Sequence, residues 1–154
     1  MAGYFLDSSA LAKVYHAEVG SAVVEELVLS SAATVLISRL SVVELQSACA
    51  GKVRAGVISA GDAVRLRRRF LEDIANGLLR VVALTSAHYD HAGELIGRHG
   101  VSHGLRTLDS LQLAVALGLH RAGAVENLVA SDKVLCKVAV IEGMPVTDPE
   151  TPVL

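Results

Sequence analysis

Short apolar runs alternate with helical patterns along the whole chain. Runs typical of buried β-strands lie at Gly3–Leu6, Val35–Ser38, Leu79–Leu84, Leu128–Ala130 and Val138–Ile141. The expected helices are Ser9–His16, Ser21–Ser30, Val42–Ala55, Ala60–Asn76, Ser86–His99, Leu108–Arg121 and Lys133–Lys137. Because strands that alternate with helices pair in parallel, we predict an α/β fold built on one parallel sheet.

The size and composition of the chain are those of one domain without a long flexible linker. We expect residues 1–154 to form a single domain with a C-terminal tail over about 146–154. Two of the three prolines lie in this tail, and the third, Pro145, directly precedes it. The net charge of −2 provides no general attraction for nucleic acid, so any such affinity must come from a local patch.

The N-terminus and the two cysteines bear on location. There is neither a basic start followed by a long apolar stretch nor an uncharged run long enough to span a bilayer, so we expect no membrane segment. Cys49 and Cys136 have no Cys-x-x-Cys spacing and fit buried thiols better than a disulfide or a zinc site. These features favour a cytoplasmic protein.

Two predicted strands end in a carboxylate. Asp7 directly follows Tyr4-Phe5-Leu6, and Asp132 lies two residues after the run Leu128-Val129-Ala130. Since parallel sheets bind their ligands outside the carboxyl ends of the strands, both acids are expected at the same edge.

Two further acids stand in apolar helical stretches, Glu44 in SRLSVVELQSACA and Asp109 in LRTLDSLQLAVALGL. Each of the four acids also has an ordinary explanation. Asp7 can start a loop, Glu44 can complete a capping box with Ser41, Asp109 can favour the first turn of a helix, and Asp132 can begin one. No single acid is specific evidence of a site.

Four carboxylates at one sheet edge would repel one another unless a cation were bound between them. A site made only of oxygen ligands suits Mg²⁺ or Mn²⁺, with water in the remaining positions. Such ions hold phosphodiester oxygens and lower the pKa of a bound water. The combination therefore indicates metal-assisted hydrolysis of phosphodiesters.

Four segments, FLDSSALAKVYHAEVGS, SRLSVVELQSA, GLRTLDSLQLAVAL and VASDKVL, resemble the acidic motifs of PIN-domain ribonucleases, above all the VapC toxins of toxin–antitoxin pairs. The resemblance implies a three-layer α/β/α fold with a central five-stranded parallel sheet. It also implies that Asp7, Glu44, Asp109 and Asp132 carry Mg²⁺ or Mn²⁺ and the attacking water for cleavage of RNA. A homodimer and inhibition by a small cognate antitoxin are further implications.

The chain departs from the family's pattern before its last acid. Many relatives have Thr or Ser two residues before it, whereas this chain has Ala130 there and Ser131 beside the acid, where Ser131 can cap the helix or orient Asp132. Ser8 matches the small hydroxyl residue after the first acid and is expected to support the site. Arg106, three residues before Asp109, is a candidate for contacting phosphate, with a surface arginine as the alternative.

The helix after Asp7 carries residues whose exposure decides their role. We expect Lys13 to face outward, as a phosphate contact or more simply as a solvent-side charge. Leu11, Val14 and Tyr15 can serve an antitoxin or dimer contact if they are exposed, and core packing is the alternative.

Other functions fit the sequence less well. A carboxylate-nucleophile phosphohydrolase needs a second acid two residues after the first, and that position is Ser9. No GxGxxG follows the first strand, which disfavours a nicotinamide cofactor. The remaining alternative is a catalytically silent PIN-like module that binds RNA or protein.

Overall fold

The computed structural model describes residues 1–151, and within them it contains one sheet of five strands in the order β3-β2-β1-β4-β5. All neighbouring strands are parallel. The strands are β1 (Ala2–Leu6), β2 (Ala33–Ser38), β3 (Arg80–Val82), β4 (Asn127–Val129) and β5 (Val146–Thr147). The predicted five-stranded parallel sheet is confirmed.

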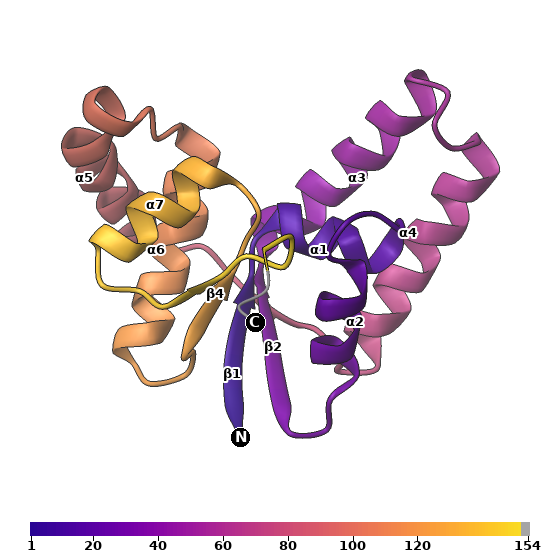
Figure 1. Ribbon diagram of the computed structural model, residues 1–154, viewed down its shortest axis with the longest axis horizontal. Helices are drawn as coiled ribbons and strands as arrows, with labels where there is room; N and C mark the ends of the chain where they lie inside the picture. The colour runs from indigo at the N-terminus through magenta and orange to yellow at the C-terminus, as the bar shows by residue number, and fades with distance from the viewer. Residues whose placement is uncertain (152–154) are drawn as a thin grey trace.

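Helices cover both faces of this sheet, as the three-layer prediction requires. Along the chain they are α1 (Ser8–Tyr15), α2 (Ser21–Leu29), α3 (Arg39–Arg54), α4 (Ala60–Ala75), α5 (Ser86–His103), α6 (Thr107–Arg121) and α7 (Lys133–Ile141). Figure 1 shows α1 to α4 on one side of β1 and β2, and α5 to α7 on the other.

Successive residues of the central strands point into two separate apolar cores. Phe5 and Leu128, which are paired in register, belong to the core beneath α5, α6 and α7. The next pair, Leu6 and Val129, belongs to the core formed with α1 to α4. This alternation is the two-residue period of a strand, and it explains why buried strands of a parallel sheet are apolar throughout.

The predicted strand at Val138–Ile141 is wrong, because these residues form the end of α7. Two buried residues are followed there by two exposed ones, a pattern that suits a helix lying on the core. The fifth strand is instead Val146–Thr147, at the start of the segment expected to be a tail. Ala130 N donates to Thr147 O at 3.1 Å and secures it to the sheet.

The start of α3 differs from the prediction and changes the interpretation of Glu44. Ser38 is the N-cap of this helix, and its hydroxyl accepts a hydrogen bond from Ser41 N at 3.2 Å. The capping box expected for Ser41 and Glu44 is therefore absent from this described helix. A complete capping box is instead present at the start of α4, where Ser59 and Asp62 make both reciprocal bonds.

The apolar side chains of α1 belong to the core. Leu11, Val14 and Tyr15 are all buried, so the core-packing alternative is correct and their use as a docking surface is excluded. Tyr15 packs edge-on against Phe70 with ring centroids 5.4 Å apart, and its hydroxyl donates to Asp73 at 2.7 Å. These contacts attach α4 to α1.

The structure bears on two expectations drawn from the sequence, one about membrane segments and one about the two cysteines. No helix within residues 1–151 is both long enough and apolar enough to cross a membrane. Cys49 and Cys136 are free thiols, as expected, but both are partly exposed rather than buried.

Candidate active site

The first and last acids lie at the carboxyl ends of neighbouring strands. Asp7 follows β1, and its backbone N–H donates to Val129 O at the end of β4, at 3.0 Å. Asp132 follows β4 by three residues and is the N-cap of α7, where its side chain accepts from Leu135 N at 2.8 Å. Both acids thus make helix-capping bonds at the sheet edge where a parallel α/β fold binds ligands.

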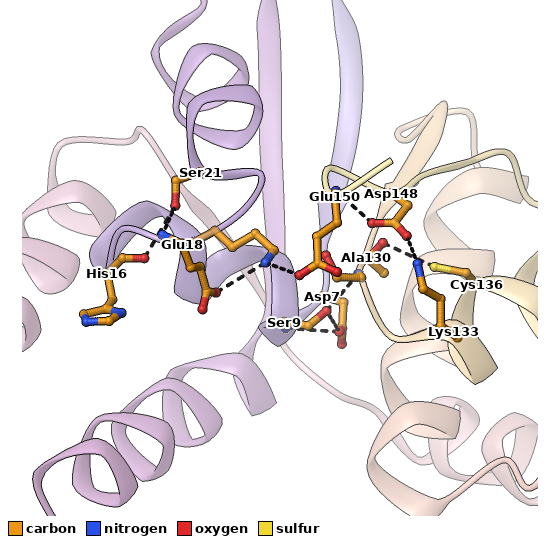
Figure 2. A network of polar contacts seen from close by, with 12 residues as sticks. Asp7, Ser9, His16, Glu18, Ser21, Ala130, Lys133, Cys136, Asp148 and Glu150 are labelled. Carbon is orange, nitrogen blue, oxygen red and sulfur yellow. Dashed lines mark hydrogen bonds and ion pairs between the residues drawn. The ribbon is translucent and has the colours of Figure 1, made fainter. Parts of the chain in front are cut away.

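Asp7 is buried, with 4% of its surface exposed. Its carboxylate caps α1 and accepts two hydrogen bonds from Ser9, at 3.2 Å from the backbone N–H and at 2.7 Å from the hydroxyl (Figure 2). Burial raises the pKa of Asp7, and the charge of Glu44 raises it further, although the bonds from Ser9 partly offset both effects.

Glu44 is held by a polar cluster inside the helix layer. One carboxylate oxygen accepts hydrogen bonds from the Ser8 hydroxyl at 2.9 Å and from the Gln112 amide at 2.8 Å. The same amide donates to Ser41 Oγ at 2.8 Å, while its oxygen accepts from Ser38 Oγ at 2.8 Å. Since Gln112 is 1% exposed, it links α3 to α6 and fixes the carboxylate within the site.

The pKa of Asp109 is shifted by burial and by the charges of the other three acids. Burial raises the pKa of Asp109 to about 6, and the charges of Asp132, Asp7 and Glu44 add to this increase. Arg106 acts in the opposite direction. The pKa of Asp109 therefore depends on the charges of the other three acids.

Ser131 does not cap the helix, because Asp132 does. Its backbone N–H donates to Ser9 Oγ at 3.1 Å, but its own hydroxyl is buried without a hydrogen-bond partner among the residues that the structure describes. Such an unpaired buried hydroxyl is unusual, because most buried polar groups have a hydrogen-bond partner.

The four acids offer only oxygen donors, the type that hard divalent cations prefer. Within residues 1–151, no three His, Cys, Asp or Glu side chains stand in an arrangement that would hold a metal ion. Mg²⁺ typically binds through one or two carboxylates and retains several waters, so it does not need a cage made only of protein side chains. The oxygen-only set of donors and their mutual repulsion fit a hard divalent cation.

A cleft of about 490 Å³ opens beside two of the four acids, Glu44 and Asp132. It is lined by side chains from the sheet edge, from α1 and α3 and from the chain end, among them Ser8, Ser9, Lys13, Glu44, Lys52, Ser131, Asp132 and Glu150. The cleft therefore contains both carboxylates and ammonium groups.

The prediction that Lys13 faces outward is wrong, because 3% of its side chain is exposed. Its ammonium lies 2.9 Å from Glu150 Oε1 and 3.4 Å from Glu18 Oε1. Burial lowers the pKa of Lys13, but the two ion pairs outweigh this effect and hold the pKa above its usual range.

Sequence reasoning missed Gln112 and Glu150. A signal for Gln112 was available, since it is a lone amide in the apolar run LQLAVALGL, and a buried amide needs partners. Glu150 gave no such signal, because it lies in a short polar segment and meets Lys13 only through a contact 137 residues distant in sequence.

Comparison with known families and structures gives a consistent result. The family model described as the PIN domain matches residues 4–141. A search of curated proteins finds no match.

Three solved structures illustrate the similarity. The first is VapC20 from Mycobacterium tuberculosis, described as a sarcin-ricin loop cleaving toxin, with 19% identity, coverage of 97% of this chain and 99% of that one, and a TM-score of 0.66. A toxin–antitoxin complex from Klebsiella pneumoniae has 16% identity, 97% and 99% coverage, and a TM-score of 0.62. VapBC2 from Rickettsia felis, bound to a DNA fragment from its promoter, has 15% identity, 94% and 97% coverage, and a TM-score of 0.64.

Proposed function

The chain belongs to the PIN-domain family, and on this basis we propose that it is a metal-dependent endoribonuclease, the toxin of a VapBC-type pair. The observation that carries the proposal is that Asp7 and Asp132 follow the neighbouring strands β1 and β4, while the Glu44 carboxylate accepts a hydrogen bond from Ser8, the residue next to Asp7. The charges of these three acids also contribute to the raised pKa of Asp109. Neighbouring carboxylates repel one another and lower the stability of the folded state unless a cation binds between them.

In this proposal Asp7, Glu44, Asp109 and Asp132 bind Mg²⁺ or Mn²⁺. The bound ion supplies a Lewis acid for the phosphodiester and lowers the pKa of the attacking water. The protein's own contribution is to hold the carboxylates in place before RNA arrives. Ser9 orients Asp7 through two hydrogen bonds, and this rigidity keeps the reacting groups aligned.

Neighbouring side chains support the acids and receive the substrate. Ser8 and Gln112 fix one oxygen of Glu44, so that its other oxygen is free to bind the ion. Arg106 stands at the N-cap of α6, exposed and close enough to lower the pKa of Asp109. We expect its guanidinium to contact an RNA phosphate and to offset part of the negative charge of the site.

The partners follow from the same family. Several solved structures with this fold are toxin–antitoxin complexes, which supports a cognate antitoxin as the partner. We expect the antitoxin to fill the acidic cleft with a basic side chain, and the toxin to be a homodimer. Two free thiols favour the reducing cytoplasm as its location.

The test is RNA cleavage by the purified protein with Mg²⁺ or Mn²⁺, compared with EDTA. Asp7→Asn should abolish cleavage, because it removes a buried carboxylate of the site while keeping its shape. Asp90→Asn, which changes an exposed acid on α5, is the matched control and should cleave normally. Cleavage that persists in both EDTA and Asp7→Asn would refute the assignment. Metal binding without any cleavage would favour the catalytically silent module.

A further inference from the structure

Lys13 presents a buried ammonium group to the same cleft as the acids. Its side chain is 3% exposed, yet it lines the cleft together with Glu44 and Asp132. The ammonium donates to two carboxylates, to Glu18 at 3.4 Å and to Glu150 at 2.9 Å. A buried lysine of this kind depends on an anion for its stability.

The two carboxylates are held differently. Glu18 comes from the connection between α1 and α2, and its backbone N–H donates to Ser21 Oγ at 2.9 Å. Glu150 comes from the chain end just after β5, and its backbone N–H donates to Asp148 Oδ1 at 2.9 Å (Figure 2). Asp148 in turn pairs with Lys133 at 2.5 Å.

Pro149 is packed closely against the protein, while the carboxylate of Glu150 remains accessible. A Cβ at Gly20 would lie 2.8 Å from Pro149 O, so the backbone before Glu150 packs directly against the turn before α2. The Glu150 side chain is nevertheless 37% exposed, against 3% for Lys13. The Glu150 carboxylate is thus the solvent-accessible member of the ion pair, whereas the Lys13 ammonium is enclosed.

The charges around Lys13 are unbalanced. One ammonium faces two carboxylates, so the group carries one excess negative charge next to the acids of the site. A phosphodiester also carries one negative charge and is a natural partner for a lysine ammonium. If a phosphate replaced Glu150, Lys13 would keep its charge balance and Glu18 would remain in place.

We propose that Lys13 is a binding subsite for a backbone phosphate of RNA, and that Glu150 occupies this subsite in the free protein until RNA displaces it. This inference rests on the proposed function, because it assigns the cleft to an RNA strand. The chain end then acts as an internal competitor that weakens RNA binding. A purely structural ion pair is the competing explanation.

The test is binding of a fluorescein-labelled single-stranded RNA of about ten nucleotides, measured by fluorescence anisotropy in EDTA so that no cleavage is needed. Glu150→Gln keeps the shape of the side chain and removes its charge, and it should tighten binding about 3–10-fold at low salt. Glu126→Gln makes the same charge change at an exposed site outside the cleft and should leave binding unchanged.

A double-mutant cycle separates the subsite from a general charge effect. Lys13→Gln should weaken binding and reduce the slope of log K against log salt by about 0.7, which is the value of one contact to a single-stranded phosphate. In the variant that combines Lys13→Gln with Glu150→Gln, the gain from Glu150→Gln should disappear. If the gain persists there, or if Glu150→Gln alone binds no tighter, the subsite is refuted.

Two further measurements keep the outcomes distinct. Urea denaturation checks that each variant is folded, and Glu150→Gln, at the accessible chain end, tests the inference even if Lys13→Gln does not fold. RNA cleavage by the wild-type protein with no effect of Glu150→Gln on binding would refute the subsite alone. Glu150-sensitive binding without cleavage would refute the nuclease and leave the subsite standing.

Discussion

Replacing Asp109 with asparagine should stabilise the metal-free protein while abolishing cleavage. In the folded state the pKa of Asp109 is raised to about 6 by burial and by Asp132, Asp7 and Glu44, from an ordinary value of 3.8. The folded form therefore holds a proton that the unfolded chain has already released. Because the folded state binds more protons, wild-type stability must fall as the pH rises from about 4 to 6.

The magnitude follows from the size of the shift. A difference of about two pKa units corresponds to about 3 kcal/mol of lost unfolding free energy once the carboxyl is ionised in both states. Since Asp109 is only partly buried, solvent screens some of this cost, and about 2 kcal/mol should remain. The amide introduced by Asp109→Asn has nearly the same shape, carries no charge and removes the cost. The gain should be about 2 kcal/mol at about pH 8 and about 0.7 kcal/mol at about pH 4.5, where the folded wild type is still protonated.

The assay is urea denaturation of wild type and Asp109→Asn in EDTA at the two pH values. Asp90→Asn, an exposed acid on α5, is the control and should differ from wild type by less than about 0.5 kcal/mol. Adding Mg²⁺ should stabilise wild type more than Asp109→Asn, since an ion that binds the folded state shifts unfolding by mass action. If Asp109→Asn is no more stable than wild type at the higher pH, then burial and the charges of the other acids do not destabilise the ionised Asp109, and the reasoning is refuted.

Two further substitutions test the framework that holds the site. Gln112→Leu should lower the unfolding free energy by about 2 kcal/mol, because it leaves buried hydroxyls without their partner, and it should also reduce kcat as Glu44 loses a bond. Gln46→Leu, an exposed amide on α3, should be nearly neutral in the same urea and cleavage assays. Gly3→Ala should cost about 3 kcal/mol in thermal or urea unfolding, since a Cβ there would lie 2.0 Å from Ala124 O. Gly97→Ala, in a helix with open space around it, should instead be neutral or slightly stabilising, and equal effects at both glycines would contradict this reasoning.

Local sequence pattern was enough to predict most of the elements and the sheet edge at which Asp7 and Asp132 lie. Four of the five predicted strands lie where the structure has strands, because a run such as Tyr4-Phe5-Leu6 is buried on both faces and cannot be a surface helix. The wrong strand, Val138–Ile141, shows the limit of this reasoning. A short apolar run fits a strand or a buried helix equally well, and packing against the core decides between them.

The sequence by itself determined that carboxylates stand at strand ends and that helices separate the strands, since both depend on residues close together along the chain. Only the tertiary structure decided which polar groups became buried partners. Glu44 meets Gln112 across two helices, and Lys13 meets Glu150 from the opposite end of the chain. The physical reason is that burial and charge pairing depend on long-range contacts, and these raise or lower the cost of each charge in ways that neighbours in sequence do not reveal.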